Sequence, residues 1–266
     1  MTAPVPVLMY HSVTETPPSS TRRLSVHPDA FARQLDLLRA HGCTTSTFGE
    51  FAAAVETGRP LPERSVVLTF DDGYADFHDT VMPLLDARGF TATVFLTTGW
   101  LADAGDRAAG RPLDRMLSWA QVRELARAGI EIGAHSHSHA QLDQIHRTAL
   151  REELRDSKAL LESETGVPVR SMAYPFGYSS ALVRSEVLAA GYRYAAAVAN
   201  TVSGTGADLL ALPRLTVRRS TDPSTFERIA RAEDLGRAYA VDRALTRGWA
   251  VVRRSRHAVN RLRGRA

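Results

Sequence analysis

Short apolar runs of strand length alternate with helix-length segments along most of this chain. The expected strands cover residues 6–10, 65–70, 91–97, 132–134, 170–174, 192–198 and 212–217. The expected helices cover residues 27–40, 75–88, 118–128, 146–163, 180–190 and 223–232. Because strands that alternate with helices form a parallel sheet covered by helices, this order predicts an α/β fold of about seven βα units.

The chain length favours one domain. A chain of 266 residues suits one barrel of alternating strands and helices, which takes roughly 200–250 residues or more. We find no linker that would divide it. We therefore expect a single catalytic barrel over residues 1–240, followed by a basic tail over residues 241–266.

The basic charge of the chain is concentrated in that tail. Residues 243–266 contain no acidic side chain and eight arginines, namely Arg243, Arg247, Arg253, Arg254, Arg256, Arg261, Arg263 and Arg265. Removing these eight charges from the formal net charge of +4 leaves −4 for residues 1–242. The charge of the main domain therefore gives no support to nucleic-acid binding.

Apolar residues such as Leu245, Trp249 and Val252 lie among the tail arginines. This mixture predicts an amphipathic helix that contacts an anionic membrane surface, and a solvated basic end is the alternative. The first ten residues resemble no signal peptide, and no run approaches the ~18 apolar residues of a membrane span. We expect a cytoplasmic protein, with the inner face of the membrane as a second location.

Two adjacent carboxylates, Asp71 and Asp72, end the apolar run at 65–70, and Gly73 follows them. A carboxylate at the end of a buried strand needs a charged partner, a metal ion or a proton. Asp-Asp-Gly is also ordinary turn chemistry. This segment alone therefore leaves both a turn and a functional site open.

Three histidines, His135, His137 and His139, follow the expected strand at 132–134. A helical or turn-like path would put His135 and His139 on one face, whereas an extended path would align all three. Neutral imidazole is a good ligand for zinc and related ions. The alternative is an exposed polar loop.

One aspartate and two histidines make a three-ligand site with room for water. An ion in such a site lowers the pKa of its bound water to about 7 and polarises a carbonyl oxygen. The second carboxylate of the Asp-Asp pair can then act as a general base. This combination predicts hydrolysis of an amide or an ester.

Three segments resemble motifs of the polysaccharide deacetylases, carbohydrate esterase family 4. They are Thr-Phe-Asp-Asp-Gly at 69–73, His-Ser-His-Ser-His at 135–139 and Tyr-Pro-Phe-Gly at 174–177. The resemblance covers about residues 5–220. It implies a distorted (β/α)7 barrel that removes acetyl groups from an N-acetylated sugar or glycan.

The same resemblance assigns roles to residues of this chain. It gives Asp71 as the general base, and Asp72, His135 and His139 as the ligands of a divalent metal. Zn²⁺ is the expected ion, with Co²⁺, Ni²⁺ and Fe²⁺ as alternatives. Phe176 would contribute a backbone N–H near the developing oxyanion.

The chain departs from the family pattern at two positions. The family commonly has an arginine two residues before the proline of its third motif, where this chain has Ala173. Arg214 could hold the Asp71 carboxylate instead, and a surface or helix-pairing arginine is the alternative. The late Leu-x-His motif is also missing, and the only late histidine is His257 in the tail.

Tyr10-His11 ends the first expected strand and resembles the variant of this family found in poly-N-acetylglucosamine deacetylases. There the general acid comes from an N-terminal strand, which implies His11 in that role; a buried structural histidine is the alternative. The expected partner is an N-acetylated carbohydrate substrate. A small nucleotide- or lipid-linked sugar, an O-acetyl ester and a non-catalytic carbohydrate-binding barrel remain alternatives.

Overall fold

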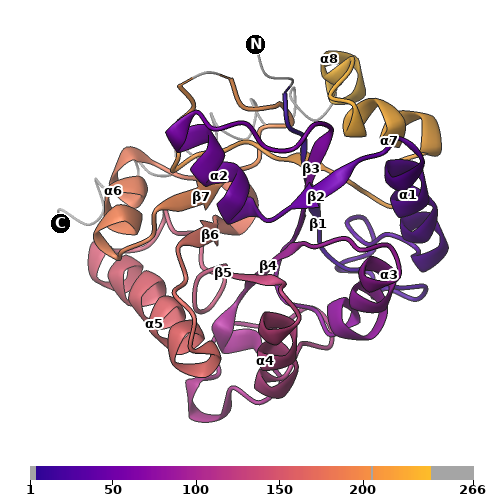
Figure 1. The fold of residues 1–266 in the computed structure, drawn as a ribbon. Coiled ribbons are helices and arrows are strands. Elements are labelled where there is room, and N and C mark those ends of the chain that lie inside the picture. Colours follow the sequence, from indigo (N-terminus) through magenta and orange to yellow (C-terminus); the bar gives the residue numbers. More distant parts are fainter. Residues whose placement is uncertain (1–3, 205, 241–266) are drawn as a thin grey trace.

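Parallel strands form the centre of the molecule and helices cover its outside (Figure 1). The structure is a computed structural model that describes residues 4–204 and 206–240. The strands are β1 (Val7–Tyr10), β2 (Thr44–Ser46), β3 (Ser65–Phe70), β4 (Thr93–Leu96), β5 (Glu131–Ala134), β6 (Ser171–Ala173), β7 (Tyr194–Ala196) and β8 (Leu215–Thr216). The α-helices are α1 (Pro28–Ala40), α2 (Phe48–Thr57), α3 (Met82–Asp86), α4 (Trp119–Arg127), α5 (Arg147–Thr165), α6 (Ala181–Ala189), α7 (Pro223–Ala230) and α8 (Leu235–Ala238).

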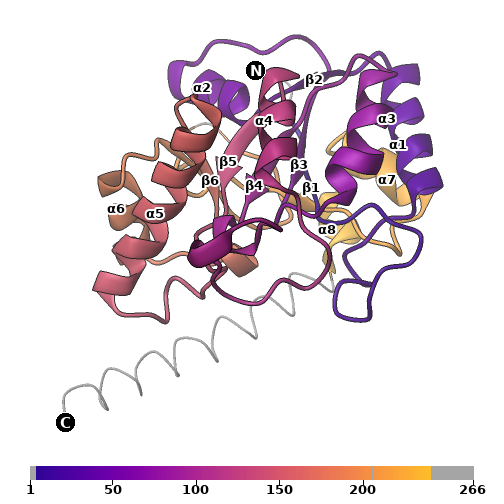
Figure 2. The same ribbon diagram turned by 90° about the horizontal axis from the view of Figure 1, so that it is seen from below.

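The strand order in the sheet is β7-β6-β5-β4-β3-β1-β8, and β2 pairs with the first half of β3. All of these helices lie outside the curled sheet: α1, α3 and α7 lie next to its β1–β3 part, and α5 and α6 lie next to its β5–β7 part (Figures 1 and 2). The arrangement is that of the distorted (β/α)7 barrel and confirms the predicted fold class.

The segment before β8 brings the two ends of the sheet together. The Leu212 N–H donates to the Ala195 carbonyl at 2.9 Å, and Leu212 forms a parallel bridge with Ala196 of β7. Three residues after Leu212, β8 begins and pairs with β1, with Leu215 opposite Leu8. Pro213 stands between these two contacts and has no N–H to donate. The predicted strand at 212–217 is therefore a bridge and a two-residue strand.

Strand β3 is buried along its whole length. Alternate side chains of a strand point to opposite faces. Leu68 and Phe70 accordingly pack in the larger core under the helices, whereas Val67 packs in the inner cluster with Phe48 and Phe95. Burial on both faces thus explains the almost continuous apolar run. Asp71 is the first residue after this buried strand.

Three of the strands and α-helices named above are absent from the sequence prediction, and one predicted helix is irregular. Strand β2 and helices α2 and α8 form over residues that the prediction left unassigned. Within the predicted helix at 75–88, residues Phe77–Val81 are π-helical and α3 follows. Pro83 cannot donate to the carbonyl four residues before it, so a regular α-helix does not run through this segment.

The predicted basic tail at 241–266 lies outside the described residues, so its amphipathic helix and membrane contact stay predictions. The cytoplasmic location also stays a prediction. Among residues 4–204 and 206–240, no helix combines the length and apolar character that crossing a bilayer requires.

Candidate metal centre and active site

The carboxyl ends of the strands bring the predicted site residues to one edge of the sheet. His11 follows β1, Asp71 follows β3 and His135 follows β5, all by one residue. In βα barrels this edge carries the chemistry. Arg214 differs, because it precedes its strand, β8, by one residue.

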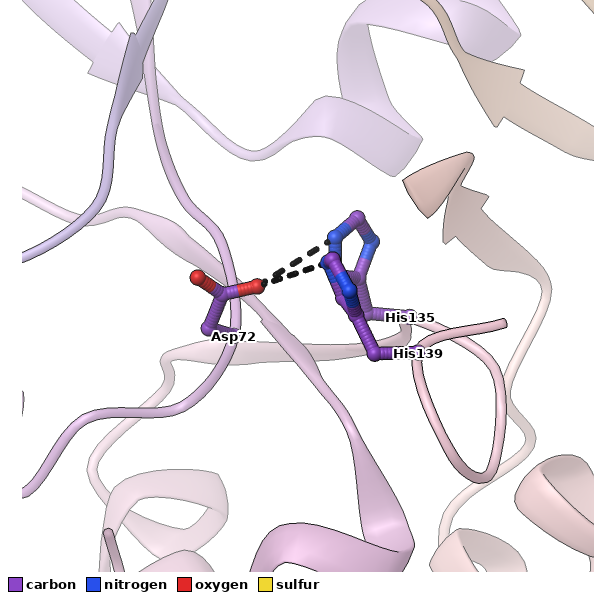
Figure 3. A group of neighbouring side chains, drawn as sticks. All are labelled: Asp72, His135 and His139. Atoms are coloured by element: carbon purple, nitrogen blue, oxygen red, sulfur yellow. Dashed lines mark ion pairs between the residues drawn. The ribbon is translucent and has the colours of Figure 1, made fainter. Parts of the chain in front are cut away.

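Asp72, His135 and His139 form a compact cluster (Figure 3). The Oδ1 atom of Asp72 lies 3.4 Å from Nε2 of His135 and 3.3 Å from Nε2 of His139. Around a tetrahedral ion with bonds of about 2.0–2.1 Å, neighbouring ligand atoms lie about 3.3–3.4 Å apart. Asp72 Oδ1 is also buried with no hydrogen-bond partner among the described residues. The three side chains therefore fit a divalent metal ion.

A backbone carbonyl sets the orientation of His135. Its Nδ1 lies 2.9 Å from the carbonyl oxygen of Ala173. Since a carbonyl can only accept, Nδ1 carries the proton and Nε2 offers its lone pair toward Asp72. Burial lowers the pKa of His135 to about 4, so the ring is neutral, as a metal ligand must be.

The loop between the two imidazoles follows neither the helical nor the extended path. Ser136 and His139 both have left-handed backbone conformations, with φ of 63° and 62°. The Ser136 hydroxyl accepts the His139 N–H at 3.1 Å. This path points His135 and His139 at Asp72, while the His137 ring lies 2.9 Å from the Thr98 hydroxyl.

The turn after β3 separates the two aspartates. Asp72 and Gly73 both have positive φ, 76° and 89°. A Cβ at position 73 would lie 2.7 Å from the Leu96 side chain, so this turn needs glycine. The result is that Asp72 reaches the histidines and Asp71 takes a different partner.

That partner is Arg214. Its Nη1 and Nη2 donate to Oδ1 and Oδ2 of Asp71 at 2.6 Å and 2.7 Å. Arg214 is 0% exposed and Asp71 is 3% exposed, which excludes the surface alternative for Arg214. Burial alone would raise the pKa of Asp71, but the charge and hydrogen bonds of Arg214, together with the charges of His135 and His11, outweigh burial and lower the pKa. Ala173 lies buried on β6 and contributes only its backbone carbonyl.

His11 lies beside both aspartates. Its charge contributes to the lowered pKa of Asp71 and of Asp72, after burial, which acts in the opposite direction. The Nδ1 atom of His11 is buried and has no hydrogen-bond partner among the described residues. The next residue, Ser12, donates from its hydroxyl to Oδ2 of Asp76 at 2.6 Å. Burial raises the pKa of Asp76 to about 6.

Two aromatic rings flank His139. Trp100 and Phe176 each have their ring centroid 4.8 Å from that of His139. Phe176 has a left-handed backbone, φ 61°, and its side chain is half exposed. The turn closes behind it through the Gly177 N–H, which donates to the Tyr174 carbonyl at 2.8 Å.

Two carboxylates at this edge were not predicted. Asp76 accepts a hydrogen bond from the hydroxyl of Ser12, the residue after His11. Glu153 of α5 accepts a backbone N–H of the loop between His135 and His139. Each belongs to a helical or turn segment rich in polar residues. Nothing in the sequence distinguishes Glu153 from its neighbour Glu152, because the difference lies in which helix face meets the loop.

Known proteins with similar sequences include polysaccharide deacetylases. The sequence profile of the family described as polysaccharide deacetylase matches residues 58–195, just over half of the chain. The chain is 29% identical over 175 residues to YxkH of Bacillus subtilis (strain 168), a protein that carries the same family name. It is 34% identical over 135 residues to the poly-beta-1,6-N-acetyl-D-glucosamine N-deacetylase of Escherichia coli (strain K12).

These matches cover 66% and 48% of this chain, but only 57% and 20% of the two relatives. Each relative is therefore matched over less than two thirds of its own length.

Solved structures share the fold. The polysaccharide deacetylase BC0361 from Bacillus cereus superposes with a TM-score of 0.73 at 26% identity, over 85% of this chain and 69% of that one. The Streptococcus pyogenes deacetylase PplD, in complex with acetate, gives a TM-score of 0.75 at 24% identity, over 84% and 96%. The second likeness shows the fold alone. The profile match and the fold confirm the resemblance found in the sequence: this chain belongs to the polysaccharide deacetylase family.

Proposed function

We propose that this protein is a metal-dependent hydrolase that removes the acetyl group from an N-acetylated sugar or glycan. The observation that carries the proposal is the pairing of an Asp72–His135–His139 cluster with a second aspartate, Asp71, held by Arg214. A metal site next to an ionised carboxylate suits hydrolysis of an amide. The relative named as a poly-beta-1,6-N-acetyl-D-glucosamine N-deacetylase supports N-acetylglucosamine as the sugar.

Asp72, His135 and His139 would hold the ion, with Zn²⁺ as the first candidate and Co²⁺, Ni²⁺ or Fe²⁺ as alternatives. When bound, such an ion polarises the acetyl carbonyl and makes water a better nucleophile. The chain contributes a neutral His135 whose ring is fixed by the Ala173 carbonyl. This keeps one lone pair aimed at the ion without any rearrangement.

Asp71 takes the role of general base. The adjacent Arg214 charge keeps its carboxylate ionised, so it can accept the proton of the attacking water. Both Asp71 oxygens accept from Arg214, and each retains a further lone pair for that proton. Arg214 orients the carboxylate and does not itself transfer a proton.

His11 takes the role of general acid and Phe176 that of oxyanion donor. His11 lies close enough to influence both aspartates and ends a different strand, so acid and base approach the substrate from separate elements. It would deliver a proton to the leaving amine nitrogen. The backbone N–H of Phe176 would stabilise the negative charge that develops on the carbonyl oxygen.

The test is acetate release from N-acetylglucosamine substrates by metal-reconstituted protein. The panel contains the monomer, oligomers, and nucleotide- and lipid-linked forms, with Asp71→Asn protein as the matched blank. Release that is lost in Asp71→Asn supports the proposal and ranks the substrates. No release from any substrate by protein with stoichiometric metal would overturn it in favour of a different acyl substrate or a binding-only barrel.

A further inference from the structure

The loop that carries the two imidazoles is held in a conformation that its own sequence does not favour. Ser136 and His139 are not glycines, yet both have positive φ. Left-handed conformations of such residues cost free energy and persist only where surrounding contacts impose them. Some element outside the loop must therefore stabilise this path.

One side of the loop contacts the segment after β4. The Gly99 N–H donates to the His137 carbonyl at 2.8 Å, and the Thr98 N–H donates to the Ser136 carbonyl at 3.3 Å. These contacts satisfy carbonyl groups. They leave the N–H groups of the loop to be satisfied from elsewhere.

The other side contacts one carboxylate, that of Glu153. Its Oε2 accepts the N–H of His137 at 2.9 Å and the N–H of Ser138 at 2.8 Å. Its Oε1 accepts the hydroxyl of Ser138. A single side chain thus satisfies three donors, and hydrogen bonds to an ionised acceptor are among the stronger ones.

Glu153 is itself rigidly placed. It lies in the second turn of α5, and the buried residues Leu150, Leu154 and Leu161 pack that helix against the core. Its neighbour Glu152 is exposed and makes no contact with the loop among those described. Of these two neighbouring glutamates, Glu153 therefore faces the loop and Glu152 faces solvent.

From these contacts we infer that Glu153 is a positioning residue for the metal centre, which holds the 136–139 loop so that His135 and His139 face Asp72 before any ion binds. The inference rests on the proposed metal-dependent function. It assigns to Glu153 no contact with substrate or with the ion. Glu153 acts through the positions of the oxygens that accept the three hydrogen bonds, and not through the negative charge of its carboxylate.

The test measures Zn²⁺ affinity of the full chain without substrate, by competition with a chromophoric chelator, together with the visible absorption of the Co²⁺ form. Glu153→Ala removes all three contacts, and we expect Zn²⁺ to bind about 10–100-fold more weakly, as for other residues that orient ligands. Glu152→Ala is the matched control on the same helix and should bind like wild type. Circular dichroism and thermal melts verify that each variant is folded.

Two conservative variants distinguish positioning from charge. Glu153→Gln keeps an oxygen for both N–H groups and offers its amide to the Ser138 hydroxyl, so its affinity and Co²⁺ spectrum should stay near wild type. Glu153→Asp keeps the charge but draws the oxygens back, so it should resemble Glu153→Ala. If Glu153→Ala does not fold, this comparison alone decides.

Folded Glu153→Ala with wild-type affinity overturns the inference, as does an Asp variant that binds normally beside a Gln variant that does not. Wild-type protein that binds none of Zn²⁺, Co²⁺, Ni²⁺ and Fe²⁺ overturns both the inference and the proposed function. Wild-type protein that binds zinc but releases no acetate overturns the proposed function only.

Discussion

At the scale of single residues, the site depends on charges that are buried together. Arg214 also lies with its guanidinium carbon 5.5 Å from the centroid of the Phe95 ring, so an apolar wall faces one side of the ion pair. Its Nη1 lies 3.2 Å from the Thr69 hydroxyl. In such surroundings a lone charge is costly, whereas a paired one is tolerated.

Replacing Arg214 by Met should therefore destabilise the protein by about 3–5 kcal/mol, because it leaves the Asp71 carboxylate buried without its counter-ion. Adding Asp71→Asn to Arg214→Met should recover part of that loss. Urea denaturation of wild type, the two single variants and the double variant gives the four unfolding free energies of this double-mutant cycle. Strictly additive losses would show that the pair is not coupled.

The role of His11 can be separated from that of Asp71 by changing the leaving group. His11→Gln should slow hydrolysis of an N-acetyl substrate by about 10²–10⁴-fold, the usual contribution of a general acid. An activated aryl acetate leaves without a proton, so its hydrolysis should fall much less. Steady-state rates on both substrates test this, with the exposed His146→Gln as control. Equal losses on the two substrates would contradict the assignment.

Asp76 should make stability depend on pH. Its folded pKa is raised from 3.8 to about 6 by burial and, less strongly, by Asp114, against the opposing effects of Ser12, Val13 and Arg115. The folded state thus favours the protonated acid. The stability it contributes is present below about pH 4 and lost as the pH rises through about 6, by up to about 3 kcal/mol.

Asp76→Asn removes this dependence. Its free energy of unfolding should fall less than that of wild type between pH 4 and pH 7. Denaturant titrations at several pH values within this window compare the two proteins. Parallel pH profiles would rule out Asp76 as the source.

The sequence predicted those residues whose chemistry is unusual where they stand: two acids at the end of an apolar strand, and three histidines in five residues. It left Arg214 undecided, because only the fold brings a position 143 residues away to Asp71. It gave no indication of Glu153 or Asp76. Their importance comes from the groups that hydrogen-bond to them, and only the folded structure shows which groups these are.

At the scale of elements, prediction succeeded where a strand is buried on both faces and failed where it is not. Strand β2 is Thr-Thr-Ser and only its last residue is buried, so it has no apolar signature. Helix α2 did carry a signal. Thr47 and Glu50 form a reciprocal capping box, and Gly58 ends the helix with φ of 70°.

Thr47→Ala should accordingly cost about 0.5–2 kcal/mol, the usual effect of losing a helix N-cap. Thr57→Ala, at the other end of α2, removes an exposed hydroxyl that donates to the Ala53 carbonyl and accepts the Arg59 N–H at 3.4 Å, and it should cost much less. Chemical denaturation of the two variants gives the comparison. A loss at Thr57 as large as that at Thr47 would argue against the capping contribution.

At the scale of the whole molecule, a metal that binds only the folded chain should stabilise all of it. Zinc at 100 times its Kd should add about 2.7 kcal/mol of unfolding free energy. In a domain of this size that raises Tm by about 5–10 °C. Thermal melts with zinc and with a chelator measure the shift, and His139→Ala should abolish it. An equal shift in His139→Ala would mean that zinc binds elsewhere.

The alternation of strands and helices indicated a parallel α/β fold, but not how the sheet curls. The distorted barrel came from the family motifs. Its irregular closure at Leu212, Pro213 and Leu215 depends on hydrogen bonds to both β7 and β1. Such a segment is too short and too interrupted to be recognised from its own residues.

The position of β1 between β3 and β8 has a consequence for synthesis. Leu8 pairs with Leu68 of β3 and with Leu215 of β8, so β1 waits for its second partner, which is made about 200 residues later. At about 5–20 residues per second, that delay is about 10–40 s. During the last part of that delay, while the 143 residues from Asp71 to Arg214 are made, Asp71 is present and Arg214 is not. A nascent chain therefore cannot bury that aspartate as an ion pair, and we expect the barrel to close only after translation has passed β8.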